Sequence, residues 1–507
     1  MVGAAAARAV QLVQAATAAG GAASATTVPS ILLLDRGKQP RFDTKDNMQK
    51  LRTVAITPMS SRILYNLGVW DELVNKHPYH RMAIRHETQW SSGLPKFPTK
   101  DEEGNDIPSS SWTDILPNPA TWFYPGARNE GGLRSTSPVL EFKDLDTPMG
   151  YICANDEIQA ALVSVLQRGS TTGVAGKSSG SDTGAEQLLP LVPPVRTAFE
   201  TVLGAVVKPG GKSVSLLRGT VHRVGSEAEG AGDAFTSHLI LGCEGGAGPG
   251  LNSVVASPTV EHDYAQNAFV CSVELEQLDG GNYSAFQNFF HDGRIVGFLP
   301  SGPTTANIVY STTKAEAMRL VKNKSESEVV EVMNRILYEI APRDIPKVVG
   351  VVKRFADGAG SSQGSGQAPQ LCIGTFPLKL KLATTPFSGR SLLLGDAAHA
   401  IHPLAGQGLN LGLYDVATMA DQLRDAKVHG EDIGSQVVLQ RCAMKMFQHT
   451  APLIAAVESI KMTTSSVPTL SCLGMNVLNV LPLIKEHGLQ YAASGQYLHN
   501  PNSLIFK

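Results

Sequence analysis

The chain has 507 residues, more than a single hydrophobic core usually accommodates, so we expect two or three packed units. Hydrophobic residues make up 42% and charged residues 17%, a composition that excludes an intrinsically disordered chain. With a net charge of -2 the sequence offers no basic surface for nucleic acid, and its six scattered cysteines form no CxxC pair, which favours a reducing compartment.

The N-terminal segment permits two interpretations. An Ala-rich helical pattern over residues 2–18 is followed by a loop of small residues and by the apolar run 31–35, which ends in Asp35. A helix followed by a strand buried on both faces predicts the second half of a βαβ unit. The lack of acidic residues before Asp35 is also typical of a mitochondrial transit peptide, although Arg8 is the only basic residue there. We favour the βαβ interpretation.

The middle of the chain combines helices, insertions and a second sheet. Apolar residues at helical spacing predict helices over 57–70, 156–168 and 325–340. Residues 87–147 are polar and rich in Pro and Gly, which predicts loops, and Gly/Ser-rich stretches typical of surface insertions follow at 169–186 and 357–369. Strand patterns predict a sheet-rich domain from residues 269–274, 294–298 and 307–311.

Residues 392–423 hold the motif with the clearest chemistry, LLLGDAAHAIHPLAGQGLNLGLYDVATMADQL. A buried strand delivers Asp396 to the carboxyl end of a sheet, where α/β proteins bind ligands. Gly395 allows a ligand to approach the backbone closely. The carboxylate of Asp396 can then accept hydrogen bonds from the hydroxyl groups of a ribose or ribitol chain.

The turn formed by Gly406, Gln407 and Gly408 opens an amphipathic helix. Its free N–H groups and its dipole stabilise an anion or the electron-rich edge of a ring, such as the pyrimidine edge of a reduced flavin. A GD pair or a GxG turn alone says little, but this order and spacing together predict a flavin site. His399 and His402 have the spacing of a metal pair, yet no third ligand of the right type lies nearby, so we expect no metal.

This stretch closely resembles the GD motif of the class A flavoprotein monooxygenases, which have the para-hydroxybenzoate hydroxylase fold. Within that group it is similar to the mitochondrial ring hydroxylases of ubiquinone (coenzyme Q) biosynthesis. The resemblance implies FAD as the cofactor, with Asp396 on the ribitol chain and Pro403 beside the isoalloxazine ring. Together with matches elsewhere, it implies cofactor-binding roles for Gly3, Asp35, Arg52, Asn155, Glu244, Gly245, Gly395, Asp396, Pro403, Gly406, Gln407, Gly408 and Asn410.

The start of the chain departs from the family's pattern. The family begins with a buried strand and GxGxxG, whereas here Gly3 fits only the last glycine of that fingerprint, and Asp35 fits the acid that binds the adenosine ribose. The first strand and two glycines are therefore missing, which predicts weak FAD binding because that strand is central and its turn holds the pyrophosphate. A start codon placed too far downstream, or a shortened isoform, would explain the departure.

The middle of the chain departs as well. Where the family has GADG followed by an arginine, this chain has Gly-Cys-Glu-Gly-Gly with Glu244 in place of the aspartate, and no arginine follows Asn252 and Ser253. In the family this site supports the pyrophosphate and contacts the reductant. The change puts direct use of NAD(P)H in doubt. It agrees with the mitochondrial members, which take electrons from a ferredoxin.

We therefore predict an α/β fold: a doubly wound, Rossmann-like FAD-binding domain that lacks its first strand, an inserted mixed β-sheet substrate domain, and a helical C-terminal tail. The FAD-binding domain would comprise residues 1–110 (a truncated βαβ unit), parts of 111–255 with long loop insertions, and 372–436 with the GD motif. Residues 256–371 would form the substrate domain and 437–507 the C-terminal helical region.

The predicted function is FAD-dependent hydroxylation, through a flavin hydroperoxide, of the aromatic ring of a polyprenylated phenol or hydroxybenzoate in ubiquinone biosynthesis. The sheet face near residues 298–300 would cover the ring, but no catalytic residue can be named. The alternatives are a flavin monooxygenase for another apolar substrate, of the squalene-epoxidase kind, and a non-catalytic homologue acting in a ubiquinone-synthesis complex.

The resemblance also implies partners and a location. The second substrate is O2, and the reductant is a ferredoxin with its reductase, with NAD(P)H as the other candidate. We expect other ubiquinone-synthesis enzymes in a complex and a location on the matrix side of the mitochondrial inner membrane. The uncharged segment 462–484 favours peripheral contact with that membrane over a span.

Overall fold

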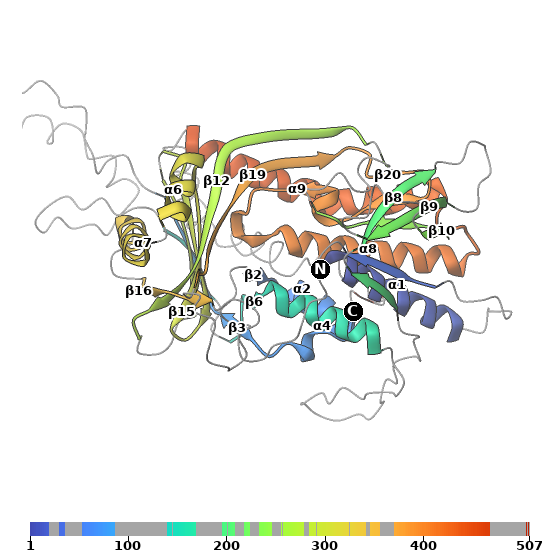
Figure 1. Ribbon diagram of the computed structural model, residues 1–507, viewed down its shortest axis with the longest axis horizontal. Coiled ribbons are helices and arrows are strands. Elements are labelled where there is room, and N and C mark those ends of the chain that lie inside the picture. Colours follow the sequence, from blue (N-terminus) through green and yellow to red (C-terminus); the bar gives the residue numbers. More distant parts are fainter. Residues whose placement is uncertain are drawn as a thin grey trace, which may run out of the picture.

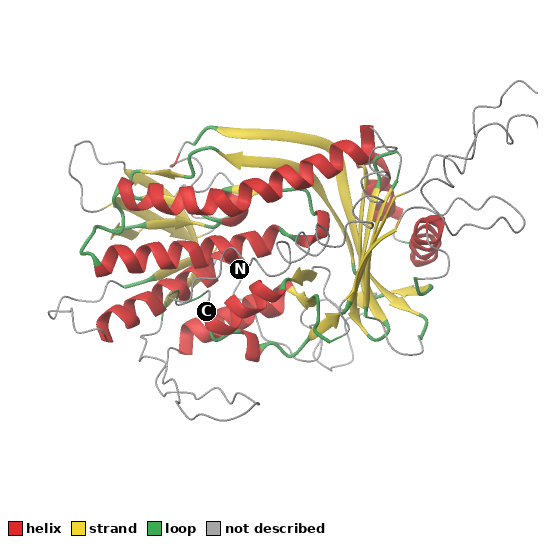
Figure 2. Ribbon diagram, turned by 180° about the vertical axis from the view of Figure 1, so that it is seen from behind, coloured by secondary structure: helices red, strands yellow, loops and turns green. Residues whose placement is uncertain are grey.

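The computed structural model describes residues 1–19, 30–35, 53–86, 139–143, 146–168, 195–199, 201–207, 217–223, 233–245, 255, 257–277, 283–290, 292–323, 325–340, 345–354, 370–466, 503 and 505. Within these segments the molecule has two halves, and Figure 2 shows the large sheet in one and most of the long helices in the other. Helices α6 (Lys314–Asn323) and α7 (Glu326–Ile340) lie beside the large sheet (Figure 1). Strands β12 (Thr259–Leu275) and β19 (Ile373–Ala383) run from one half to the other.

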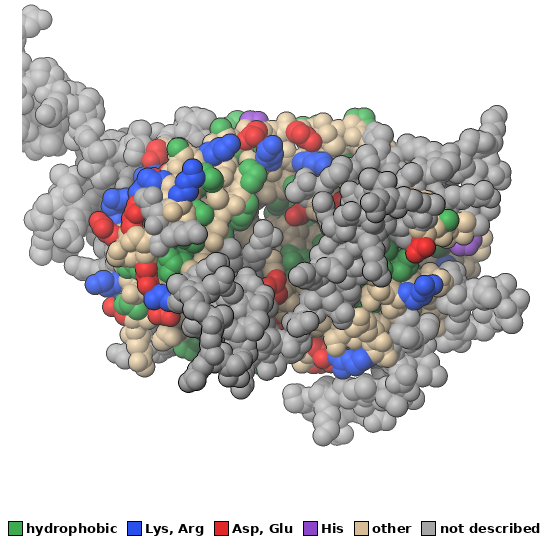
Figure 3. All heavy atoms as spheres, viewed as in Figure 1, with side chains coloured by type: hydrophobic (Ala, Val, Ile, Leu, Met, Phe, Trp, Pro, Cys, Tyr) green, Lys and Arg blue, Asp and Glu red, His purple; other side chains and the backbone are tan. Residues whose placement is uncertain are grey.

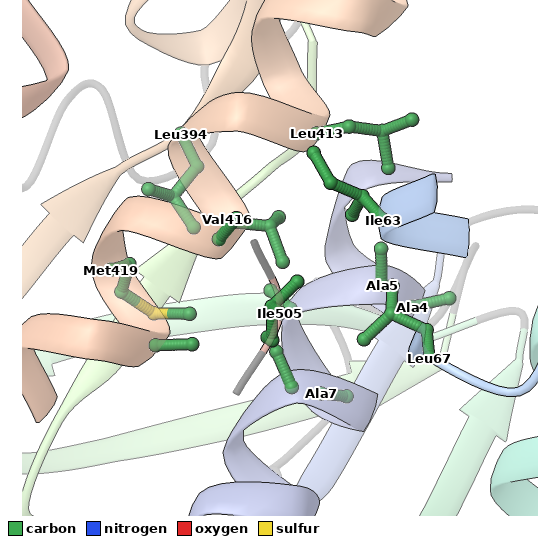
Figure 4. Packing of buried hydrophobic residues seen from close by; sticks show 14 of the residues in the cluster. Ala4, Ala5, Ala7, Ile63, Leu67, Leu394, Leu413, Val416, Met419 and Ile505 are labelled. Carbon is green, nitrogen blue, oxygen red and sulfur yellow. The ribbon is translucent and has the colours of Figure 1, made fainter. Parts of the chain in front are cut away.

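The N-terminal helix α1 (Val2–Ala19) is part of the core of the helical half. Its alanines are small enough to bring it close to α8 (Gly408–Val428). These two helices share one hydrophobic cluster with α2 (Pro58–Asn66) and α4 (Asn155–Arg168). Figure 4 shows how the side chains of α1, α2 and α8 converge in this cluster.

Arg8 serves the packing of α1 against α2. Its side chain is only 3% exposed, and its Nε donates to the carbonyl oxygen of Leu67 over 3.1 Å. Burial lowers the pKa of the guanidinium group to about 10. Arg8, the only basic residue before Asp35, therefore has a structural role, in agreement with the βαβ interpretation.

Four short parallel strands of the helical half form two separate pairs. Strand β1 (Leu32–Asp35) pairs with β7 (Arg196–Phe199), and β11 (Ile240–Gly242) pairs with β21 (Ser391–Leu393). No strand joins the two pairs among the described residues. Parallel strands with helices packed on them confirm the predicted fold class, whereas the absence of a first strand stays a prediction.

The start of α1 lies between these two pairs. A Cβ atom added to Gly3 would lie 3.3 Å from Cβ of Cys243, just after β11, and 3.7 Å from Cδ1 of Leu33 in β1. The last glycine of a dinucleotide-binding fingerprint has this role, because it allows close packing of a helix on strands. The position of Gly3 therefore agrees with the role that the resemblance implies.

The large sheet has two unlike faces. One face packs on α6 and α7 through a cluster that includes Phe298, Val329 and Met333. Phe298 itself is buried against these helices, and the expectation that the sheet face near residues 298–300 would cover a bound ring stays a prediction. The other face contributes Phe289 and Ile295 to a separate small cluster, which lies toward the helical half.

The two halves are joined by β12, β19 and α9 (Gln436–Ser466). Strand β22 (His399–Ala400), just after Asp396, pairs with the end of β19. The pairing of β12 with β19 shifts register between Asp263 and Asn267, where Ala265 has a φ of 55°. This irregularity lies where the long strands pass from one half to the other.

The predicted helices and strands are confirmed wherever the structure describes them, with ends shifted by a few residues. The loop region 87–147 was predicted wrongly in part, since residues 139–143 form a strand. The two Gly/Ser-rich stretches and most of 462–484 lie outside the described residues, and the bounds of the five predicted segments stay predictions. Within the described part, no helix is long and apolar enough to cross a membrane. The remaining elements are β2 (Thr53–Ile56), η2 (Trp70–Glu72), β3 (Lys76–Tyr79), β4 (Arg81–His86), β5 (Val139–Lys143), β6 (Gly150–Ala154), β8 (Thr201–Val207), β9 (Leu217–Arg223), β10 (Asp233–Ser237), β13 (Ser284–Phe289), β14 (Ile295–Gly302), β15 (Thr305–Thr313), β16 (Val348–Val351), β17 (Lys353–Arg354), β18 (Gln370–Leu371), β20 (Phe387–Ser388), η4 (Gly395–Ala397) and η5 (Leu404–Gly406).

Candidate functional site

The turn after β21 presents a carboxylate at the start of α8. Gly395 has a φ of +58°, a conformation that favours glycine, and Asp396 follows with an exposed side chain. A Cβ atom added to Gly408 would lie 3.5 Å from Oδ1 of Asp396. Although the carboxylate reaches solvent, the protein packed around it raises its pKa, because the charged form loses hydration. A ligand hydroxyl that donates to Asp396 would compensate for that loss.

A buried carboxylate from α8 holds this turn. Oδ2 of Asp415 accepts hydrogen bonds from the backbone N–H of Gly395 at 2.9 Å and from Nε2 of His399 at 2.6 Å. Its Oδ1 lies 3.2 Å from Nε2 of His449 in α9. Asp415 is completely buried, so the three contacts tie the GD turn, α8 and α9 into one polar network inside the core.

The pKa shifts in this network favour a proton on His399 over one on Asp415. Burial alone would raise the pKa of Asp415, but the charge of His399 and hydrogen bonds from His399 and His449 hold it well below its usual value. Burial alone would lower the pKa of His399, but the charge of Asp415 and the hydrogen bond to it raise that pKa. The two shifts favour a buried ion pair between Asp415 and His399, which would fix the turn by charge as well as by hydrogen bonds.

The start of α8 is clamped to β2. Asn410 donates from Nδ2 to the carbonyl oxygen of Ala55 at 2.8 Å, and its Oδ1 accepts from the backbone N–H of Thr57 at 3.1 Å. Gly406, with a φ of +63°, turns the chain into the helix. The N–H groups of the first turn have no intrahelical partners, so they form a donor cradle beside Asp396. The side chain of Asn410 thus shapes the cradle; its predicted contact with a cofactor stays a prediction.

Val2, at the start of α1, closes the back of this cradle. A Cβ atom added to Gly395 would lie 3.1 Å from Cγ2 of Val2, and one added to Gly412 only 2.6 Å from the same atom. Both glycines are therefore required for the close approach of α1 to the GD turn and α8. This approach brings the N-terminal ends of α1 and α8 toward Asp396, and helix N-termini favour anionic groups.

Three other predicted residues lie at the ends of α4 and β11. Asn155 stands at the start of α4, and its Oδ1 is buried without a hydrogen-bond partner among the described residues. An unsatisfied buried acceptor of this kind fits a donor on a bound ligand. Glu244 is exposed just after β11, followed by Gly245 with a φ of +79°.

Two predicted positions cannot be placed. Arg52 and the side chain of Asp35 lie outside the described residues, as does the family's closing stretch at 482–495. Pro403 and Gln407 flank η5 in the turn that leads to α8. No cluster of three metal-binding side chains occurs in the described segments, and His399 is engaged by Asp415.

The comparisons with known proteins agree with this geometry. Residues 218–432 match the family described as FAD binding domain. Over 92% of this chain and 84% of the relative, the sequence is 26% identical to the ubiquinone biosynthesis monooxygenase COQ6, mitochondrial, of Danio rerio. Over 42% of this chain and 47% of the relative, it is 32% identical to the 3-demethoxyubiquinol 3-hydroxylase of Escherichia coli (strain K12).

Solved structures share the fold at lower sequence identity. The p-nitrophenol 4-monooxygenase PnpA from Pseudomonas putida DLL-E4 superposes with a TM-score of 0.56 at 13% identity, over 95% of this chain and 94% of that one. PqsL from Pseudomonas aeruginosa, a probable FAD-dependent monooxygenase, gives a TM-score of 0.55 at 14% identity, over 92% and 96% of the two chains. These structures confirm the predicted fold, while the family match and the sequence relatives confirm the FAD cofactor and the monooxygenase class.

Proposed function

We propose that this chain, an FAD-dependent monooxygenase similar over most of its length to ubiquinone-biosynthesis hydroxylases, hydroxylates the aromatic ring of a polyprenylated phenol or hydroxybenzoate in that pathway. One observation carries the proposal: the exposed carboxylate of Asp396 stands beside the helix start at Gly408, in a turn fixed by buried Asp415. This arrangement presents an acceptor for ribitol hydroxyls and donors for a flavin ring edge at one place.

FAD, when bound, supplies the oxygen chemistry, and the residues of the chain bind and orient its parts. Asp396 would accept hydrogen bonds from the ribitol chain. The donor cradle at the start of α8 would stabilise negative charge on the pyrimidine edge of the ring. Asn155, with its unsatisfied Oδ1, would accept a further hydrogen bond.

The substrate ring would lie against a small apolar cluster beside the flavin turn. The cluster combines Leu404 of η5 and Val457 of α9 with Phe289 and Ile295 from the large sheet. Figure 3 shows a hollow near the middle of the visible face, with apolar and acidic side chains at its bottom. Apolar walls at this place would orient an aromatic ring and exclude water from the reacting atoms.

The same resemblance supports a mitochondrial location and, more finely, a place on the matrix side of the inner membrane. Helix α9 carries exposed apolar side chains that a membrane surface could accept, namely Val437, Met444, Phe447, Ile460 and Met462. We propose a ferredoxin with its reductase as the electron donor, supported by the exposed Glu244 where the family has aspartate. NAD(P)H is the alternative donor, and other ubiquinone-synthesis enzymes are the proposed partners in a complex.

The function is tested by expressing the chain in cells that lack the ubiquinone ring hydroxylase and measuring ubiquinone by mass spectrometry. Asp396→Ala, which removes the carboxylate, serves as the inactive control. Restored ubiquinone with the wild type and not with the variant supports the proposal. Protein that carries FAD but hydroxylates only other apolar substrates would contradict the substrate assignment.

A second candidate function is a non-catalytic role in a ubiquinone-synthesis complex. It is favoured by the separation of β1–β7 from β11–β21, since the residues described provide no central strand for a pyrophosphate-binding turn. Absorbance spectra of the purified protein with added FAD decide between the two functions. A stoichiometric flavin spectrum supports the enzyme, and a colourless protein supports the non-catalytic role.

A further inference from the structure

A compact polar cluster forms where β12, α9 and the flavin turn meet. Nζ of Lys461 lies 3.3 Å from the centroid of the Tyr264 ring and donates to Oε1 of Gln266 at 3.1 Å. The hydroxyl group of Tyr264 donates to the carboxylate of Glu458, one helical turn before Lys461. The cluster coincides with the register shift of β12, so the irregular strand presents Tyr264 to α9.

His402 completes the cluster from the flavin turn. Its ring stands edge-on to that of Tyr264, with centroids 5.2 Å apart and planes at 74°. The side chain is 1% exposed, yet neither ring nitrogen has a hydrogen-bond partner among the described residues. Burial first, and then the charge of Lys461, lowers the pKa of His402 to about 3, so the ring is neutral and offers one donor and one acceptor.

This cluster borders the apolar wall described above. His402 directly precedes Pro403 and Leu404, and Leu404 packs in the same apolar cluster as Val457, the neighbour of Glu458. An apolar wall with one cationic and one neutral donor at its edge matches a phenol, which has a flat apolar ring and a single ionisable hydroxyl group. An unsatisfied imidazole at that edge calls for a polar ligand atom.

We propose that Lys461 and His402 bind the phenolic oxygen of the aromatic substrate, with the Lys461 ammonium group stabilising the phenolate. The inference rests on the proposed function and names the part of the site that recognises the substrate. The phenolic O–H bond breaks, its proton passes to water, and the oxygen keeps the electron pair. That pair makes the ring electron-rich at the positions where an oxygen atom is added.

The charge on Lys461 sets a pH range for this role. Burial lowers the pKa of Lys461 to about 8, with the charge of Glu458 opposing the shift. The ammonium form therefore predominates at neutral pH and is lost as the pH rises through about 8. Among the described residues, Tyr264, Glu458 and His402 are titratable groups that interact with it, and of these three Glu458 carries the formal negative charge.

The test uses the FAD-loaded protein and 4-nitrophenol, whose phenolate form is yellow. The pH at which bound 4-nitrophenol ionises is compared with that of the free compound. We expect the wild type to lower the pKa of the bound phenol and Lys461→Met to reverse that change by about one unit, a tenfold loss of preference for the phenolate. Lys461→Arg should retain the effect, and Lys445→Met, at an exposed position of the same helix, should not alter it.

The outcomes separate the two proposals. If 4-nitrophenol has the same pKa bound to the wild type as free in water, the phenolate site is wrong while the hydroxylase function stands. The same holds if Lys461→Met changes that pKa no more than Lys445→Met does. If the wild type lowers the pKa of bound 4-nitrophenol but restores no ubiquinone in cells, the proposed function fails instead. Circular dichroism and flavin content show whether Lys461→Met is folded. His402→Gln is a second test variant, which should also weaken the lowering of the pKa of bound 4-nitrophenol.

Discussion

The two sides of the flavin site differ in how the chain builds them. On the isoalloxazine side, Asp415 accepts hydrogen bonds from Gly395 and His399, and Asn410 clamps α8 to β2. On the pyrophosphate side, the described strands stay in two separate pairs, with Gly3 of α1 packed between them. The first side combines contacts within residues 395–415 with contacts to β2 and α9. The second depends on pairing between strands far apart in sequence.

The largest expected effect comes from breaking the buried network on the isoalloxazine side. Asp415→Ala removes the acceptor of Gly395 and leaves His399 without its counter-ion. Breaking a buried ion pair typically costs about 3–5 kcal/mol, because one charge stays buried and uncompensated. Urea unfolding should therefore show a loss of this size.

The matched control for this prediction is Asp425→Ala on the same helix. The Asp425 side chain is 45% exposed and pairs with Arg424, so its loss should cost less than about 1 kcal/mol. Equal losses for the two variants would mean that the Asp415 network does not stabilise the fold.

Removing the carboxylate at the ligand side should affect binding rather than folding. Asp396→Ala deletes an exposed side chain that makes no hydrogen bond with the described residues, so the free energy of unfolding of the FAD-free protein should change by less than about 0.5 kcal/mol. Hydrogen bonds to a charged group contribute about 1.5–3 kcal/mol, which corresponds to a tenfold to hundredfold weaker Kd for FAD. Titration of flavin fluorescence measures that Kd. An unchanged affinity in a folded variant would remove Asp396 from the site.

The contact between the two sides can be tested at Gly412. A Cβ atom there would lie 2.6 Å from Cγ2 of Val2, so Gly412→Ala should force α1 away from α8. Overpacking of this kind costs about 1–3 kcal/mol in unfolding free energy. Val2→Ala in the same chain should recover part of the loss, because it removes the colliding methyl groups. Additive effects in this double-mutant cycle would contradict the packing of Val2 on Gly412.

The comparison also shows what the sequence could and could not predict. Asp396 and the turn at Gly406 were predictable, because one contiguous stretch contains the strand, the carboxylate and the helix start. Asp415 lies in that stretch, but a polar residue on a helix is usually solvated, and nothing local shows that it faces inward. His449 and Lys461 come from α9, so only tertiary packing brings them to the site. The burial of Phe298 against helices was not predictable, because strand alternation does not tell which face of a sheet meets which partner.

The smallest expected effect is the pH dependence that the network gives to stability. The pKa of Asp415 is lowered on folding, so its contribution is present above its unfolded pKa of about 4 and is lost as the pH falls. The pKa of His399 is raised on folding, so its contribution is complete below its unfolded pKa of about 6.5 and is lost as the pH rises through the raised value. Stability from this pair should therefore be greatest between about pH 4 and 6.5.

Two variants separate the acid and alkaline limbs of that profile. His399→Gln should remove the alkaline decline and keep much of the acid decline, because His449 still donates to Asp415. Asp415→Asn should flatten both limbs, because the carboxylate is the common partner. Urea unfolding from about pH 4 to pH 9 measures the three profiles. The free energy of unfolding of the wild type and both variants could instead depend on pH in the same way. In that case no ion pair would hold the GD turn, and hydrogen-bond geometry alone would fix the isoalloxazine side.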